Sequence, residues 1–185
     1  SFGCFSFYPT KILGGYGDGG FILTNDFNLY KKAKNIRFYG IDTVDKKNKF
    51  FNKYYSNING VNSRLDELNS SILDYKLKKT DIFIKKRRLI ANIYNQKLRK
   101  TSLVLPSTNN KLFDVYHLYT VFHKKRDFII KSLLKKGIQT RIIYPYPIHK
   151  MKGYKNLFKN KIFKISEIKS KGIFSLPMYP ELNIK

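Results

Sequence analysis

The sequence predicts an α/β fold. Short apolar and aromatic segments, typical of strands, alternate with segments whose apolar residues recur at helical spacing. Glycine-rich or polar stretches separate these segments, as turns and loops do. After Leu103 strands and helices follow one another closely, which is the pattern of a small α/β domain.

The opening residues predict a strand, a turn, a second strand and a helix. Residues 2–8 have the composition of a buried strand, and the glycines within 14–20 permit the positive φ angles of a turn. Residues 21–24 predict the second strand, and Asp26 is placed to cap the helix that follows. Cys4 lies within the first apolar run, where a small buried thiol is expected.

Two helices are predicted in the middle of the chain. Residues 40–60 are polar and flanked by glycine, so we expect a surface loop there. Ser63 or Asn62 is the expected cap of the next helix, which has an apolar stripe at Leu65, Leu68, Ile72 and Tyr75. A second, longer helix is expected over 80–98, after a tight corner.

The rest of the chain predicts strands and helices in alternation. Strands are expected at 115–122, 138–144 and 173–176, and helices from Arg126 to a stop at Gly137 and over 162–171. We therefore predict a domain at 1–80, a linking helix at 81–100 and a small α/β domain at 101–185.

Composition restricts the classes of function. The net charge of +25 suits a partner such as nucleic acid, but only seven of the 37 basic residues are arginines, and the lysines are scattered. Base-reading proteins rely on clustered arginines, so nucleic-acid binding is disfavoured. No apolar run approaches the roughly 18 residues of a membrane span. A single cysteine excludes a disulfide framework and fits a reducing cytoplasm, and no metal-ligand cluster is expected.

Lys11 lies between the predicted first strand and the glycine turn. A strand fixes the base of such a side chain, and glycines let a planar group approach the backbone. An amine held in a partly desolvated pocket is suited to form a Schiff base. With 30 lysines in the chain, composition alone gives Lys11 no preference over an ordinary surface lysine.

Five segments, in order, resemble the DegT/DnrJ/StrS family of sugar aminotransferases. They are 5–14 (FSFYPTKILG) with 17–20 (GDGG), 60–68 (GVNSRLDEL), 116–119 (YHLY), 144–149 (YPYPIH) and 175–182 (SLPMYPEL). The resemblance spans nearly the whole chain. It implies the C-terminal half of a fold-type I enzyme that uses pyridoxal phosphate, comprising the end of the large cofactor domain and a small α/β domain. The start at Ser1, inside an apolar run, likewise leads us to expect a fragment without its N-terminus.

The resemblance implies roles for individual residues. Lys11 would bind the cofactor covalently and move protons between the cofactor and the sugar. Ser6 would hydrogen-bond the cofactor phosphate, although a serine satisfied by the backbone is the alternative. Asn62 would reach the phosphate of the neighbouring subunit in a homodimer with a shared active site, or cap a helix, or both. Arg64 would lie beside it or form a structural ion pair.

Two further residues are expected near the substrate. His149 and Tyr146 lie in a segment that two prolines stiffen, which suits positioning. A lone histidine in a loop is nevertheless often incidental. His117 is expected to pack within a strand, and the turn alone explains Asp18.

The implied reaction transfers an amino group from glutamate to a nucleotide-linked keto-deoxysugar. The motifs most resemble the branch that aminates C3 of dTDP-3-keto-6-deoxyhexoses, and C4 amination of a UDP-, dTDP- or GDP-4-keto-6-deoxyhexose is the alternative. In this family the aspartate at the pyridine nitrogen precedes the lysine segment, so the chain by itself is expected to be catalytically incomplete.

Other classes also remain. Some family members resemble regulatory proteins. Others resemble dehydratases, which carry histidine at the position of Lys11, so the lysine argues against that class. A basic nucleic-acid-binding protein without transaminase activity is the alternative from another class.

Overall fold

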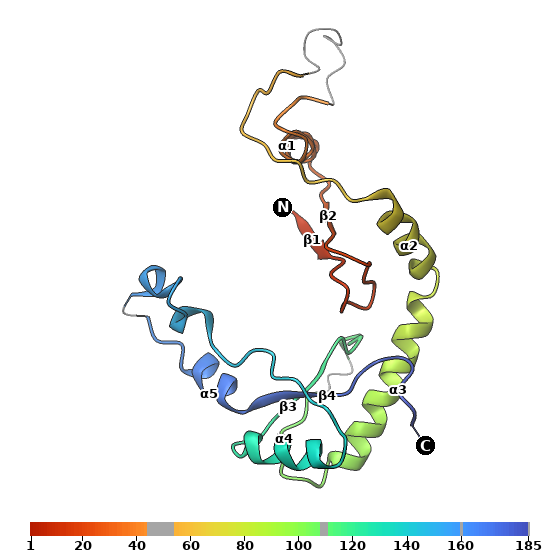
Figure 1. The fold of residues 1–185 in the computed structure, drawn as a ribbon, viewed down its shortest axis with the longest axis vertical. Coiled ribbons are helices and arrows are strands. Elements are labelled where there is room, and N and C mark those ends of the chain that lie inside the picture. The colour runs from red at the N-terminus through yellow and green to blue at the C-terminus, as the bar shows by residue number, and fades with distance from the viewer. Residues whose placement is uncertain (44–53, 108–110, 160, 185) are drawn as a thin grey trace. The chain divides into compact units, whose positions relative to one another are not determined.

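A computed structural model describes residues 1–43, 54–107, 111–159 and 161–184. The chain forms two compact units, Ser1–Thr80 and Asp81–Lys185, and each is described here by itself. Figure 1 labels the elements, which mix helices with short strands, as the predicted α/β class requires. None of the described helices is both long and apolar enough to cross a membrane.

The first unit begins with a hairpin. Strands β1 (Gly3–Ser6) and β2 (Gly20–Leu23) pair antiparallel, and the Phe5 and Phe21 rings stack with centroids 4.3 Å apart. The predicted first strand therefore exists, but the prediction that it and Cys4 are buried is wrong: Cys4 is exposed and Phe5 is 50% exposed. The apolar side chains of β2 are exposed as well, with Phe21 at 42%, Ile22 at 56% and Leu23 at 59%.

Helix α1 (Phe27–Arg37) follows the hairpin and confirms the predicted cap. The Asp26 carboxylate accepts the backbone N–H groups of Asn28, at 2.9 Å, and Leu29, at 3.1 Å. This satisfies two of the amides that a helix start leaves without partners. Residues 44–53 of the predicted loop lie outside the described part of the chain.

Helix α2 (Glu67–Leu77) begins later than predicted. Its cap is Asp66, whose carboxylate accepts the Asn69 N–H at 3.0 Å. Asn62 and Ser63 are not caps, because Asn62 forms an antiparallel bridge with Phe38 and is held in extended backbone. The buried face also differs from the predicted stripe. Asn69 and Leu73 are buried, whereas two members of that stripe, Leu68 and Tyr75, are exposed.

The second unit contains the long helix α3 (Thr80–Leu98) and a two-stranded antiparallel sheet of β3 (Tyr119–Phe122) and β4 (Ile173–Leu176). Its other helices in the described ranges are the α-helices α4 (Arg126–Lys135) and α5 (Lys164–Gly172) and the 3₁₀ helices η2 (Ile148–Lys150) and η3 (Lys155–Phe158). Gly137, with φ +76°, follows the end of α4 as predicted. The predicted strand at 138–144 is wrong, because only Arg141 there pairs with the sheet, in a bridge to Ser175.

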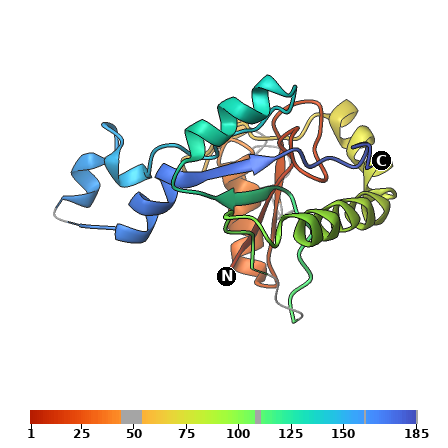
Figure 2. The ribbon, with the colours of Figure 1, turned by 90° about the horizontal axis from the view of Figure 1, so that it is seen from below.

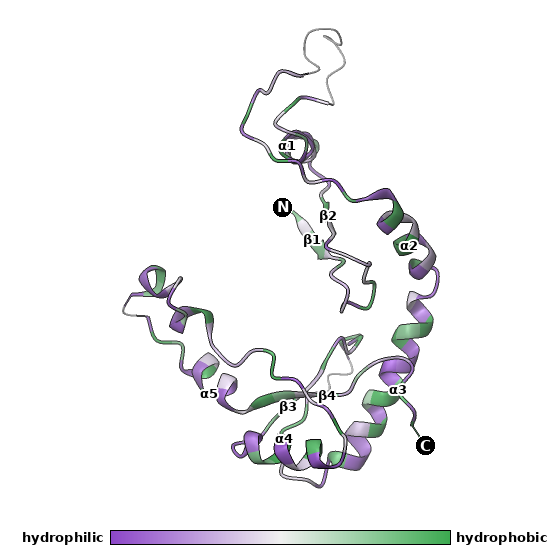
Figure 3. Ribbon diagram, in the orientation of Figure 1, coloured by the Kyte–Doolittle hydropathy of each residue, from purple (hydrophilic) through white to green (hydrophobic). Residues whose placement is uncertain are grey.

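The core of this unit lies where the sheet meets α3 and α4. Tyr119, Val121 and Phe174 are almost completely buried, and Ala91 of α3 packs with them. Figure 2 shows α4 running along the β3–β4 sheet, and Figure 3 shows the hydrophobic length of β4. On α4, Ile129 and Leu133 pack against this core, whereas Phe128 and Leu134 are exposed.

A buried arginine joins α3 to this core. Arg87 Nη1 donates to the backbone carbonyls of Tyr116 at 3.1 Å, His117 at 3.1 Å and Met178 at 2.9 Å. Desolvation lowers the pKa of its guanidinium. The Tyr119 hydroxyl donates to Asn95 Oδ1 at 2.5 Å, and burial raises the pKa of Tyr119 to about 12.

Candidate functional site

Lys11 lies in a closed loop that leaves the end of β1. The Lys11 N–H donates to the Tyr8 carbonyl at 2.8 Å, which closes a tight turn over residues 8–11. Four residues later the Gly15 N–H donates to the Phe7 carbonyl, also at 2.8 Å, and so ties the two ends of the loop together. Lys11 is half-buried, and its backbone is held from both sides.

Glycine is required where the loop closes. A Cβ on Gly14 would lie 2.5 Å from the Pro9 carbonyl oxygen, and one on Gly15 would lie 2.2 Å from Asn69 Oδ1. Both glycines are buried, so a side chain there would displace neighbouring atoms. Gly17 is different, because a Cβ there would meet nothing within 4 Å. The glycine turn is thus packed on one side and open at Gly17.

Ser6 is the last residue of β1, five positions before Lys11. Its side chain is exposed, and its Oγ accepts the Tyr8 N–H at 3.2 Å. A hydroxyl that accepts in this way still has its own proton to donate. The Ser6 oxygen therefore has a backbone partner, which was the expected structural alternative. Its O–H proton can still be donated to a phosphate oxygen, as the expected cofactor role requires.

Asn62 and Arg64 lie on the extended segment before α2. The Ser63 N–H donates to the Arg37 carbonyl at 2.9 Å, and Asn62 bridges to Phe38, so this segment is tied to the end of α1. Arg64 lies over the Phe38 ring, with its Cζ 5.6 Å from the centroid. Both side chains are exposed. They occur in the same unit as Lys11 and Ser6.

The residues of the first unit fit pyridoxal phosphate. That cofactor has an aldehyde, which a primary amine can attack, and a phosphate, which needs hydrogen-bond donors. Lys11 supplies the amine and Ser6 supplies a hydroxyl donor at the end of the preceding strand. The glycine turn leaves its Gly17 side unobstructed. This donor set suits the cofactor that the family resemblance implies.

His149 and Tyr146 belong to the second unit. His149 Nε2 lies 3.0 Å from Glu167 Oε1, its ring contacts Phe163 at 4.8 Å between centroids, and its side chain is only 7% exposed. Hydrogen bonding to His149 is the main cause that lowers the pKa of the Glu167 carboxyl. Tyr146, by contrast, is 69% exposed. His149 thus holds its loop against α5, and of the two side chains Tyr146 is the exposed one.

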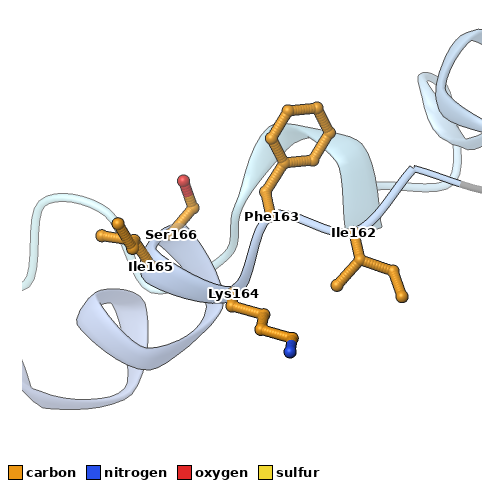
Figure 4. A pocket seen from close by; sticks show the side chains of 5 residues that line it. All are labelled: Ile162, Phe163, Lys164, Ile165 and Ser166. Atoms are coloured by element: carbon orange, nitrogen blue, oxygen red, sulfur yellow. The ribbon is translucent and has the colours of Figure 1, made fainter.

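A surface hollow lies at the start of α5 but lacks the features of a site. Five consecutive residues line it, from Ile162 to Ser166. Figure 4 shows their side chains pointing in different directions instead of converging on one point. Binding sites need convergent polar groups within an apolar pocket, so we place no function there.

The sequence reading missed Asn69 and Lys76. Asn69 Oδ1 accepts the Tyr16 N–H at 2.9 Å, and Lys76 Nζ donates to the Gly14 carbonyl. The signal for Asn69 was weak: a polar residue four positions before Leu73, at the edge of the predicted stripe and outside it. Nothing in the sequence distinguished Lys76 from the other lysines.

Comparison with known proteins gives consistent results. The model of the DegT/DnrJ/EryC1/StrS aminotransferase family matches residues 1–185. The chain is 39% identical over 185 residues to the dTDP-3-amino-3,4,6-trideoxy-alpha-D-glucose transaminase of Micromonospora megalomicea subsp. nigra, covering 96% of this chain and 47% of that protein. It is 37% identical over 182 residues to the pleiotropic regulatory protein of Geobacillus stearothermophilus, covering 96% and 46% respectively.

Solved structures agree with the fold. The crystal structure of S. venezuelae DesV in complex with a ketimine intermediate aligns with a TM-score of 0.88 at 32% identity, covering 100% of this chain and 48% of that one. The chain therefore spans about half the length of the relatives it matches. Aminotransferases of this family depend on pyridoxal phosphate. From the match over its whole length and this structural likeness, the chain belongs to the DegT/DnrJ/EryC1/StrS aminotransferase family.

Proposed function

We propose that the protein is a pyridoxal-phosphate-dependent aminotransferase that moves an amino group from glutamate to a nucleotide-linked keto-deoxysugar. The observation that carries the proposal is the half-buried Lys11 in a loop closed by the Phe7–Gly15 hydrogen bond, with Ser6 at the end of the strand before it. Membership of an aminotransferase family supports the same chemistry.

Each residue has a proposed task. Lys11 holds the cofactor through its Nζ, and this amine, once released, takes and returns protons at the reacting carbon. Ser6 donates its hydroxyl proton to the cofactor phosphate, and the exposed Asn62 and Arg64 face the phosphate of the partner subunit's cofactor. Tyr146 contacts substrate. When bound, pyridoxal phosphate supplies an electron sink for bonds at the amine-bearing carbon.

C3 of a dTDP-3-keto-6-deoxyhexose is the proposed site of amination. A relative with 39% identity is named for a 3-amino sugar, which supports C3 over C4. One relative is named a regulatory protein, and that name describes the relative alone. The present chain has Lys11, whose primary amine is the group that the proposed reaction requires.

We further propose a homodimer with shared active sites, located in the cytoplasm. The single cysteine suits a reducing compartment. Within each subunit, residues 1–80 form the C-terminal part of the large cofactor domain, 81–100 the linking helix and 101–185 the small domain. The division of the chain into compact units at Thr80 supports this proposal.

The test uses the full-length protein. Incubation with pyridoxal phosphate, glutamate and a dTDP-3-keto-6-deoxyhexose should yield 2-oxoglutarate and a sugar aminated at C3, identified by NMR. Lys11→Ala should abolish the visible absorption of the lysine-bound cofactor, whereas Lys32→Ala, at an exposed position on α1, should leave it unchanged.

Three results would contradict the proposal. Borohydride reduction that tags another lysine would sink the assignment of Lys11. An amine at C4 would reject the regiochemistry and keep the reaction. Absence of cofactor uptake by the wild-type protein would reject the enzyme altogether, in favour of a regulatory role.

A further inference from the structure

The position of Lys11 depends on where its loop returns to the rest of the unit. The loop leaves β1 at Phe7 and returns at Gly15, and the Phe7 N–H also donates to the Gly19 carbonyl at 2.8 Å. These bonds tie the loop to the hairpin. Within this unit a second support holds the return of the loop.

Helix α2 provides that support through a buried polar side chain. Asn69, 8% exposed, lies on the buried face of the helix, and its Oδ1 accepts the Tyr16 N–H at 2.9 Å. The same amide group contacts Gly15, where the missing Cβ leaves room for it. Tyr16 directly follows the loop closure, so this hydrogen bond fixes the first residue after the Phe7–Gly15 pair.

Two further contacts from the same segment reinforce this hold. Lys76 Nζ, two turns further along α2, donates to the Gly14 carbonyl. Leu65 lies against Gly19, where an added Cβ would be 2.8 Å from its Cδ1. The helix thus contacts the return of the loop at Gly14 and at the Gly15–Tyr16 peptide, and Leu65, just before the helix, contacts it at Gly19. These contacts act on Lys11 through the loop backbone.

We propose that Asn69 is a positioning residue for Lys11: by accepting the Tyr16 N–H it holds the loop in the conformation that presents the Lys11 amine to pyridoxal phosphate. This inference rests on the proposed function. Asn69 touches neither cofactor nor substrate in this account. A leucine of similar size would fill the same space but would leave the Tyr16 N–H without its acceptor.

Binding of two forms of the cofactor can distinguish a misplaced Lys11 amine from general damage to the cofactor site. Pyridoxal phosphate binds covalently: the Lys11 amine condenses with its aldehyde, a C=N bond forms, and the aldehyde oxygen leaves as water. Pyridoxamine phosphate has an amine in place of the aldehyde and binds without this condensation. A misplaced Lys11 therefore weakens binding of the first form and leaves binding of the second.

The experiment measures both affinities in the full-length protein for wild type, Asn69→Leu and Asn69→Asp. Asn69→Leu should weaken pyridoxal phosphate about tenfold, the effect of one lost hydrogen bond with its amide left unpaired, and change pyridoxamine phosphate by less than about twofold. Asn69→Asp retains an acceptor oxygen and should restore binding to within about threefold of wild type. Asn28→Leu, at an exposed position on α1, is the matched control and should alter neither affinity.

A second measurement needs no cofactor. In the cofactor-free protein, hydrogen exchange of the peptide that contains Tyr16 should accelerate in Asn69→Leu and not in Asn69→Asp. Lys76→Met, which removes the other side-chain bond to the loop, should shift both readouts in the same direction as Asn69→Leu.

The outcomes distinguish the inference from the function on which it rests. Equal losses for the two cofactor forms, or no loss for either, would overturn the positioning role while wild-type transamination stands. Wild-type protein that binds neither form would overturn the proposed function, and the inference with it.

Discussion

Substitution of Gly15 by alanine tests the contact between the lysine loop and α2. An added Cβ would lie 2.2 Å from Asn69 Oδ1 and 2.9 Å from its Cγ, distances that no pair of such atoms tolerates. The Asn69 side chain must rotate away, and it then loses the Tyr16 N–H, which it accepts at 2.9 Å. Gly15→Ala therefore breaks one defined hydrogen bond, from the Tyr16 N–H to the buried Asn69 side chain.

The expected magnitude follows from two opposing terms. An amide left without its partner costs about 1–3 kcal/mol. Replacing glycine by alanine also restricts the unfolded chain, which stabilises the folded state by about 0.4–1 kcal/mol. Gly15→Ala should thus lower the free energy of unfolding by about 1–2 kcal/mol. Gly17→Ala is the control, since its Cβ meets nothing within 4 Å, and it should change stability by less than about 0.5 kcal/mol or raise it slightly.

The assay is urea unfolding of the full-length protein in a double-mutant cycle with Asn69→Ala. Because Asn69→Ala removes the obstructing side chain, Gly15→Ala in that background should be nearly neutral. The two substitutions should therefore couple by about 1–2 kcal/mol. Additive effects, or a Gly15→Ala protein as stable as wild type, would refute the contact and with it the structural basis for the role of Asn69.

Two further predictions concern the second unit. Arg87→Met should lower the free energy of unfolding by about 2–4 kcal/mol in urea, because three backbone carbonyls lose a charged donor. Lys86→Met, at an exposed position, is the control and should have little effect. Similar unfolding midpoints for the two variants would refute this prediction. Glu167→Gln should lower the thermal midpoint near neutral pH. Since the folded-state pKa of this carboxyl lies below its ordinary 4.5, the stability it contributes is present above that value and is lost as the pH falls through the folded pKa. The difference between wild type and Glu167→Gln should accordingly disappear in acid, and a difference that persists there would count against the contacts of the Glu167 carboxylate with His149 and Lys150.

Local signals in the sequence predicted the elements that depend on local chemistry. Asp26 caps α1 as expected, because an aspartate at that position can reach the first amides whatever the rest of the fold does. Gly137 follows the end of α4 as expected, because the chain leaves the helix with a φ of +76°, a backbone conformation that favours glycine. β4 was predicted over 173–176, where an apolar run lies between turn signals, and the structure has it at Ile173–Leu176.

Tertiary contacts decided the remainder. Asn62 and Ser63 have good capping side chains, but pairing with α1 and Phe38 draws their backbone into an extended conformation, and the capping role passes to Asp66. The segment 138–144 has strand-like composition, yet only Arg141 finds a partner. A strand exists only where another strand pairs with it, and that partner cannot be read from local composition.

In the candidate site, too, residues in local motifs were predicted and a residue placed by tertiary contacts was missed. Lys11 and Ser6 were found through motifs close together in the sequence, whereas Asn69, 53 residues from the amide it binds, was not. An asparagine on a helix is ordinarily an exposed residue, and the prediction followed the more apolar side of α2. Asn69 is buried because Gly15 has no side chain, which leaves room for the Asn69 amide against the loop.

The reactivity that we propose for Lys11, one lysine among 30, would come from confinement rather than composition. A surface lysine samples many rotamers, and holding its amine against an aldehyde loses that freedom at each encounter. The backbone around Lys11 is already fixed by the turn to Tyr8, by the closure at Gly15 and by the contacts of α2 with the returning chain. Its backbone therefore has little conformational entropy left to lose when the amine meets the aldehyde. In the proposed function, the glycines and Asn69 would matter because a fixed loop backbone leaves the Lys11 side chain fewer positions to search.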